Sequence, residues 1–411
     1  MSVKVAVTGG GPAGLTVASR LSSKGVEVTV FEEHAQVGWP VHCAGLVSSK
    51  GLELIGIKDE SFVLNNVRGA IFYSPSGRNV LIVSRPEVQA KVIDRLSFDY
   101  LLYRKALKND VNFEFKAPII RVKKTGGNAW ILRTNRRTFK GFDLLIDAEG
   151  YSSKIIRSIG IRDSRQMIPA IQYEIQGISD MDSDFVEIFT GKCWAPGFFA
   201  WLIPLSSDEA RIGLASTFKP RFMLNRLILK HPALRERTKH IRIKKVYGGL
   251  VVVSGPNPKP YGDGFMLVGD AAGHVKPTTG GGVVFGILGA LLAAKVVIKI
   301  IEEDEMFNES SLSYYRKLWL KLYAAEFKLM KIARKLLDIL PDNFIENLFA
   351  KGKESGLEDV ATTFGDIDFQ STVITKTLTS RTFLNVAIKS LTGFLAPIQG
   401  LSSKMKTQKL I

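Results

Sequence analysis

The sequence of 411 residues contains only two cysteines, Cys43 and Cys193. Two thiols cannot build a disulfide framework, a four-cysteine zinc site or an iron–sulfur cluster. Such low cysteine use fits a reducing cytosol best. The sequence therefore predicts a cytoplasmic protein without a metal centre.

The sequence also lacks a long apolar run that is free of charge. Its longest apolar segment, GGGVVFGILGALLAAKVVIKII, opens with three glycines and contains Lys295 and Lys299. We interpret this segment as a buried helix of a large domain, and a membrane span is the less favoured alternative. No signal peptide is expected, because MSVKVAVTGG leads directly into a strand.

Acidic side chains are scarce relative to basic ones: 39 against 56, with a net charge of +17. This balance suits an anionic partner such as an acidic membrane surface, a phosphate-bearing substrate or nucleic acid. A merely basic, soluble surface explains the charge equally well. Because no zinc-finger, RRM or similar signature occurs, nucleic acid is not expected as a partner.

The N-terminal segment VKVAVTGGGPAGLTVASRLSSKGVEVTVFEEH predicts a strand, a tight turn, a helix and a second strand. In the turn, Gly9, Gly11 and Gly14 form a GxGxxG pattern, whose glycines allow backbone and helix N-terminus to approach a pyrophosphate. Glu32 ends the second strand, where a carboxylate takes the ribose hydroxyls of an adenine dinucleotide. A Rossmann-like dinucleotide site is predicted.

A second glycine-rich block, YGDGFMLVGDAAGHVKPTTGGGVVFGILGALLAA, lies far along the chain. It predicts a short buried strand ending in Asp270, followed by the long apolar helix opened by Gly280–Gly282. A nicotinamide dehydrogenase needs no such return of the chain, whereas the extended FAD molecule does. Asp270 can bond ribityl hydroxyls, and the backbone at Gly281–Val283 can stabilise charge near N1 of reduced flavin. FAD is therefore the predicted cofactor.

The sequence resembles the FAD-dependent geranylgeranyl reductases (digeranylgeranylglycerophospholipid reductase-like), within the p-hydroxybenzoate hydroxylase-like flavoprotein superfamily. The resemblance covers most of residues 1–300 and is carried by GGGPAG, VFEE, CAG, VIDRLSFD, IDAEG and GDAAGHVKPTTGGG. It implies an α/β fold (α+β overall), with a Rossmann-like FAD-binding domain interrupted by a mixed or antiparallel sheet. We expect the FAD-binding domain at 1–66, 86–162 and 258–305, the substrate-binding sheet at 67–85 and 163–257, and a helical region at 306–411.

The resemblance also implies a set of cofactor contacts. The family's flavin-lining cysteine and alanine match Cys43 and Ala44, and its FAD-contacting arginine matches Arg95, within an expected helix VIDRLSFDYLLYRKAL. Where many members have Asp-Gly, this chain has Glu149-Gly150, and Glu149 can still cap the following turn. The predicted FAD-binding residues are Gly9, Gly11, Pro12, Ala13, Gly14, Glu32, Cys43, Ala44, Arg95, Ala117, Asp270, Gly281, Gly282 and Val283.

An aromatic segment at 191–215, GKCWAPGFFAWLIPLSSDEARIGLA, predicts a loop and two strands. The reductases carry a P–Y–x–W–x–F–P type motif here, so the resemblance implies substrate contacts from Pro196, Phe199, Trp201 and Pro204. Phe199 and Ile203 replace the motif's tyrosine and phenylalanine, and a more apolar site suits a hydrocarbon. Ordinary core packing is the alternative. The segment also resembles the W–x–W–x–I–P motif of flavin-dependent halogenases.

Cys43 is the candidate catalytic residue, because the family places this position against the flavin. Saturating an isolated alkene needs hydride from flavin N5 and a proton at the other carbon. A neutral thiol, or a water it orders, can deliver that proton, and apolar surroundings would keep the thiol protonated. Cys193 is a second thiol that can face the cavity, and the adjacent His42 is a candidate for tuning Cys43.

From about residue 306 the pattern becomes helical, and no acidic residue follows Asp368. The segment RTFLNVAIKSLTGFLAPIQGL is amphipathic enough to lie on an anionic membrane, at the inner face. Helical capping of the substrate cavity explains the same pattern. The basic residues after Asp368 are Lys376, Arg381, Lys389, Lys404, Lys406 and Lys409.

The leading functional prediction is an oxidoreductase that uses FADH2 to saturate prenyl chains of membrane lipids or prenylquinones. One alternative is a membrane-docked flavoprotein that passes electrons to quinone. Another is a monooxygenase or halogenase, which would consume oxygen. Because the sequence contains no second dinucleotide motif, the electron donor stays open between ferredoxin and NAD(P)H.

Overall fold

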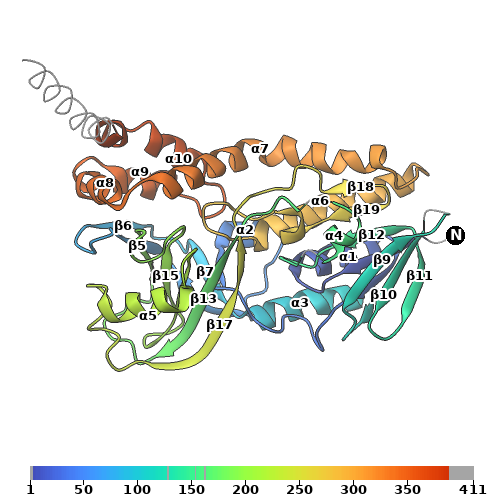
Figure 1. Cartoon of the computed structure of the whole chain (residues 1–411), viewed down its shortest axis with the longest axis horizontal. Helices are drawn as coiled ribbons and strands as arrows, with labels where there is room; N and C mark the ends of the chain where they lie inside the picture. The colour runs from blue at the N-terminus through green and yellow to red at the C-terminus, as the bar shows by residue number, and fades with distance from the viewer. Residues whose placement is uncertain (1–2, 127–128, 153, 162, 388–411) are drawn as a thin grey trace, which may run out of the picture.

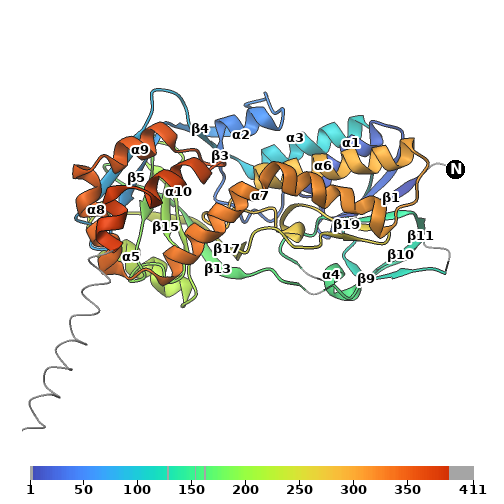
Figure 2. The same cartoon turned by 90° about the horizontal axis from the view of Figure 1, so that it is seen from above.

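A computed structural model describes residues 3–126, 129–152, 154–161 and 163–387. The molecule is elongated, with a parallel sheet at one end, a larger sheet at the other and long helices that run between them (Figures 1 and 2). The helices are α1 (Pro12–Ser22), α2 (Ser49–Leu54), α3 (Arg95–Lys108), α4 (Lys154–Ser158), α5 (Pro220–Lys230), the 3-10 turn η1 (Gly269–Ala272), α6 (Val283–Glu302), α7 (Glu309–Ile339), α8 (Asp342–Glu354), α9 (Leu357–Phe364) and α10 (Ser371–Leu378).

The first sheet contains the predicted Rossmann-like unit. Its alternating valines are fully buried, as expected for strands that are covered on both faces. The strands β1, β2, β8, β12 and β19 are parallel, and β18 adds an antiparallel edge. In spatial order, this sheet is β18 (Tyr261–Gly262), β19 (Phe265–Leu267), β12 (Leu144–Asp147), β1 (Lys4–Thr8), β2 (Glu27–Phe31) and β8 (Asn112–Glu114).

The turn between β1 and α1 depends on two glycines. Gly9 has a φ of +97°, and a Cβ at Gly9 would lie 2.3 Å from the carbonyl oxygen of Ala148. A Cβ at Gly14 would lie only 2.0 Å from the carbonyl oxygen of Gly9. Only glycine therefore lets α1 pack this closely on the sheet.

The second sheet is predominantly antiparallel, with one parallel pair between β5 and β14. All of its strands fall within residues 67–85 and 163–257, and α5 packs on β13 and β16. The predicted α/β architecture with a second, mixed sheet is confirmed. In spatial order, the sheet is β17 (Arg242–Val252), β13 (Met167–Gln176), β16 (Glu209–Ala215), β15 (Ala200–Pro204), β14 (Phe185–Phe189), β5 (Gly69–Tyr73) and β6 (Val80–Ser84).

Two small sheets complete the part of the chain that the structure describes. They comprise β11 (Thr138–Phe142), β10 (Trp130–Thr134) and β9 (Ile119–Lys124), and β3 (Leu46–Ser48), β7 (Ala90–Ile93) and β4 (Val63–Val67). The helix expected over VIDRLSFDYLLYRKAL begins later than predicted. Ile93 ends β7, and the carboxylate of Asp94 caps α3 by accepting a 2.9 Å hydrogen bond from the Ser97 amide.

The C-terminal helices lie along the molecule and over the second sheet (Figure 2). α7 packs on α6 and α10, and α8 and α9 contact β6. Among the described residues, α6 is one helix that is long and apolar enough to cross a membrane, but 67% of its apolar window is buried inside the protein. This burial agrees with the predicted core helix. Lys389, Lys404, Lys406, Lys409 and most of the predicted amphipathic segment lie outside the described residues.

Two glycine-to-alanine substitutions in this turn test the packing argument. Gly14→Ala forces a Cβ against the Gly9 carbonyl and is expected to lower the free energy of unfolding by about 3 kcal/mol or more. A Cβ at Gly11 meets no protein atom within 4 Å, so Gly11→Ala should change stability by less than about 1 kcal/mol. Urea unfolding of both variants measures the difference, and equal losses would contradict the packing argument.

Candidate active site

A cavity of about 560 Å³ lies between the two sheets and reaches from the N-terminal glycine turn to the aromatic segment. Its wall includes residues from the first sheet, the second sheet and the C-terminal region. The predicted cofactor residues on the wall are Gly9, Gly11, Pro12, Ala13, Glu32, Cys43, Ala44, Arg95, Ala117, Asp270, Gly281, Gly282 and Val283. Gly14 is buried behind the wall, where it allows the helix to pack.

The glycine turn has the shape that a pyrophosphate requires. The Cβ position of Gly11 faces open space, so a ligand can approach the backbone there. Pro12 follows as the first residue of α1, where a missing N–H costs no helical hydrogen bond. The residues present therefore fit an extended dinucleotide at this end of the cavity.

Glu32 lies beside the glycine turn, as predicted, and also holds it. One carboxylate oxygen accepts a 2.7 Å hydrogen bond from the Gly10 amide. The other accepts hydrogen bonds from the amide of His34 at 2.9 Å and lies 2.6 Å from that residue's ring Nδ1. Glu32 thus fixes the turn on which the predicted ribose contact depends.

Arg95 and Cys43 lie next to each other on the cavity wall. Arg95 forms a bidentate pair with Asp99, at 3.1 and 3.0 Å. Burial opposes the charge of Arg95, but Asp99 and the Cys43 sulfur outweigh it and raise the pKa of Arg95. The Cys43 Sγ also accepts a hydrogen bond from the Gly45 amide at 3.3 Å. The surroundings of the Cys43 thiol therefore include a guanidinium and a backbone amide.

Sequence reasoning missed Arg211, which positions the Cys43–Gly45 loop from β16. Its side chain is only 5% exposed. One guanidinium nitrogen donates to the carbonyl oxygens of Ala44, at 3.0 Å, and Ile93, at 3.1 Å. A Cβ at Gly45 would lie 2.2 Å from the same nitrogen, so the loop needs glycine there. Arg211 therefore joins the second sheet to the loop that contains the candidate catalytic thiol.

Arg165, also missed, performs a similar task near Asp270. Its fully buried guanidinium donates to the carbonyl oxygens of Gly150, Asp270 and Ser152 at 2.8, 3.0 and 3.1 Å. Burial raises the pKa of the Asp270 carboxyl, although Arg95 and Arg165 oppose this. The loop after β12 and the turn before α6 are thus joined through one buried cation.

The aromatic end of the cavity consists of Phe198, Phe199 and Trp201. The rings of Phe198 and Phe199 stack at 4.4 Å, and the Trp201 indole N–H donates to Gln172 Oε1 at 2.8 Å. Ile203 also lines this end, two residues along the strand from Trp201. Phe199 and Trp201, two of the predicted substrate-binding residues, thus line the cavity.

Three other predicted residues lie elsewhere. Pro196 and Pro204 do not line the cavity; their carbonyl oxygens accept hydrogen bonds from Thr217 and Asn65. Cys193 does not face it either, because its thiol lies 3.6 Å from the Pro75 carbonyl oxygen. Burial raises the pKa of Cys193 to about 12. His42 lines the cavity but is exposed.

Glu149 caps the turn after β12, as predicted, by accepting a 3.2 Å hydrogen bond from the Ile155 amide. Burial and the neighbouring Asp147 raise the pKa of Glu149 to about 7. Burial also raises the pKa of Asp147 to about 6. Two neighbouring carboxyl groups, one on the cavity wall and one buried behind it, therefore both have raised pKa values.

The family model described as lycopene cyclase protein matches residues 4–399. A digeranylgeranylglycerophospholipid reductase of Thermoplasma volcanium is 32% identical over 365 residues, covering 82% of this chain and 90% of that relative. The chain belongs to the lycopene cyclase protein family and is related to the digeranylgeranylglycerophospholipid reductases. The predicted family is thereby confirmed.

Solved structures share this fold. A geranylgeranyl bacteriochlorophyll reductase-like protein from Thermoplasma acidophilum has a TM-score of 0.82 at 26% identity, covering 95% of this chain and 99% of that one. The flavin-dependent brominase Bmp2 has a TM-score of 0.70 at 19% identity, with coverage of 95% and 99%. At this lower identity the likeness to the brominase shows the fold alone.

The Arg211 contacts predict how the Cys43 loop responds to substitution. Arg211→Met removes a donor from two carbonyl oxygens and should cost about 1–3 kcal/mol of stability. Because the loop loosens, alkylation of Cys43, followed by peptide mass spectrometry, should become several-fold faster. Arg237→Met breaks another buried pair, with Glu187, away from the loop, and should leave the Cys43 rate unchanged. Equal rates in the two variants would refute the positioning role.

The carboxyl pair predicts a pH dependence. Folding raises the pKa of Glu149 from 4.5 to about 7, so the folded state binds more protons and stability falls as pH rises through this window. Glu149→Gln keeps the cap but not the charge. It should therefore stabilise the FAD-free protein by about 1 kcal/mol at pH 8 and have little effect at pH 5. Urea unfolding at both pH values tests this, and a pH-independent difference would count against it.

Proposed function

We propose that this protein is an FAD-dependent reductase that hydrogenates isolated C=C bonds of geranylgeranyl or other prenyl chains of membrane lipids or prenylquinones. The observation that carries the proposal is one continuous cavity that joins a dinucleotide-binding turn to an aromatic and aliphatic wall. The relatives named as digeranylgeranylglycerophospholipid reductases support the substrate class.

The two ends of the cavity suit the two molecules. The glycine turn, Glu32 and Asp270 would hold FAD, which supplies hydride from its reduced ring when bound. Phe199, Trp201 and Ile203 offer a hydrocarbon chain a surface that removes it from water. Such a wall binds by area rather than by directed hydrogen bonds, which fits a substrate without polar groups near the reacting bond.

Cys43 and Arg95 are neighbours on the wall of this cavity. In the proposal the Cys43 thiol, or a water that it holds, protonates the second carbon of the alkene. The adjacent guanidinium and the Gly45 amide orient the sulfur. Arg95 itself is held by Asp99, so the sulfur faces a fixed positive charge.

The electrons and the lipid substrate would come from separate sources. The electrons would come from a reduced ferredoxin or NAD(P)H. The sequence contains one GxGxxG turn, which the flavin would occupy, so it does not choose between these donors. The lipid substrate would be drawn from the cytoplasmic face of an anionic membrane, which the net charge of +17 favours.

The test is made without oxygen. The FAD-loaded protein is reduced with dithionite and mixed with a geranylgeranyl glycerophospholipid, and flavin absorbance and lipid mass are followed together. Flavin reoxidation with a gain of two hydrogens per double bond is expected. Reoxidation by a quinone whose side chain keeps its mass, with no reaction on the lipid, would refute the reductase.

Cys43→Ser and Cys193→Ser form a matched pair in the same assay. Cys43→Ser should retain FAD but reduce the lipid about 100-fold more slowly, since a weaker acid replaces the thiol. Cys193→Ser should keep the wild-type rate, because Cys193 lies away from the cavity. Equal rates for both variants would exclude Cys43 as the proton source.

A further inference from the structure

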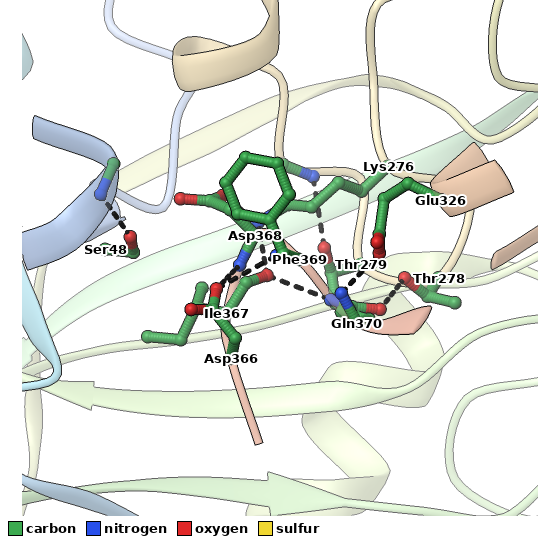
Figure 3. Close-up of polar contacts among 12 residues, drawn as sticks. Ser48, Lys276, Thr278, Thr279, Glu326, Asp366, Ile367, Asp368, Phe369 and Gln370 are labelled. Carbon is green, nitrogen blue, oxygen red and sulfur yellow. Dashed lines mark hydrogen bonds and ion pairs between the residues drawn. The ribbon is translucent and has the colours of Figure 1, made fainter. Parts of the chain in front are cut away.

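A buried lysine and a buried aspartate face each other on the cavity wall (Figure 3). The Lys276 Nζ lies 2.6 Å from Asp368 Oδ1 and donates to the Ile367 carbonyl oxygen at 2.7 Å. The two side chains are 5% and 4% exposed. The reductase mechanism proposed above makes no use of this pair.

Lys276 belongs to the loop between η1 and α6, next to the backbone expected to meet the flavin. Its amide donates to the Gly281 carbonyl oxygen at 3.1 Å. A Cβ at Gly281 would lie 3.1 Å from the Lys276 Nζ. The positive charge therefore lies beside the start of α6, whose dipole favours negative charge at the same place.

Asp368 comes from the C-terminal region, in the segment between α9 and α10. Its amide donates to Asp366 Oδ1 at 2.8 Å, and Glu326 of α7 accepts from the Ser371 amide at 2.8 Å. A further contact of 2.5 Å joins Thr278 Oγ1 to Gln370 Oε1. Asp368 is therefore held firmly against the loop that contains Lys276 (Figure 3).

The second carboxylate oxygen of Asp368 has no hydrogen-bond partner among the described residues, although it is buried. A Cβ at Gly51 would lie 2.4 Å from it, so α2 covers this oxygen with backbone. With one oxygen bound only by Lys276 and the other unbound, the negative charge of Asp368 is balanced chiefly by Lys276. Charges in such a setting act strongly over a few ångströms.

We propose that the Lys276–Asp368 pair sets the reduction potential of the bound flavin, with Asp368 offsetting the effect of Lys276. This inference rests on FAD occupying the cavity. Reduction of the flavin by the donor, a reduced ferredoxin or NAD(P)H, adds two electrons and one proton and leaves a negative charge on the ring. Lys276 stabilises that charge and raises the potential, and Asp368 lowers it again.

The offset matters because an isolated alkene is a poor hydride acceptor. A lone buried cation beside the flavin would stabilise the reduced form and make it a weaker reductant. By placing Asp368 against Lys276, the C-terminal region keeps the reduced flavin reactive while the loop keeps its shape. The pair is thus a positioning and tuning element, which touches neither the thiol nor the aromatic wall.

The test is the midpoint potential of FAD in the purified holoprotein, measured by anaerobic spectroelectrochemistry. Lys276→Met leaves Asp368 unbalanced and should lower the potential, whereas Asp368→Asn leaves Lys276 unbalanced and should raise it. The double variant K276M/D368N should lie between the two single variants. Glu187→Gln disturbs another buried ion pair, with Arg237, that is not on the cavity wall, and should leave the potential unchanged.

Shifts of the same sign in both single variants, or unchanged potentials with FAD bound, would overturn the proposal. If a single variant does not fold, the charge-swapped K276D/D368K retains a buried pair. It should lower the potential, because the negative charge then lies on the loop between η1 and α6. An unchanged potential in that variant also overturns the proposal. A wild-type protein that takes up no FAD would instead refute the proposed function itself, and this inference with it.

Discussion

Buried cations that bind backbone carbonyl oxygens hold the cavity together. Arg165 joins the turn before α6 to the loop after β12, and Arg211 joins the second sheet to the Cys43 loop. Lys276 binds the Ile367 carbonyl of the C-terminal region, and Arg334 of α7 binds the Gly197 carbonyl at 2.5 Å. Loops around a cavity cannot pair their backbone N–H and C=O groups with one another as strands do. Each lost side-chain donor would therefore leave a buried carbonyl oxygen without a hydrogen bond, which lowers stability.

The parts of the site that could be predicted from sequence are local. Glycine spacing, a strand and a helix within about thirty residues determine the turn at Gly9–Gly14 and the place of Glu32. Arg211 and Lys276 gave no such signal, because a charged residue in a strand or loop usually indicates exposure. Their partners lie 167 and 92 residues away in the sequence, at Ala44 and Asp368. Only the tertiary structure brings these groups together.

Strand geometry explains why only part of the aromatic motif lines the cavity. Successive side chains of a strand point to opposite faces, so Trp201 and Ile203 share the cavity face and Pro204 does not. The motif's spacing identifies the strand but not the residues that face the ligand. The C-terminal region illustrates the same limit. Its helical pattern was clear, but only the structure shows that Ile367 and Asp368 line the cavity.

The order of strands in the first sheet has a consequence for how this protein is made. β1 is flanked by β2, which follows at once, and by β12, which begins at Leu144; β12 in turn pairs with β19, which begins at Phe265. During synthesis the central strands therefore wait with an unpaired edge until more than half of the chain has left the ribosome. Such edges can pair with other strands, so the growing chain is exposed to edge-to-edge association during this interval.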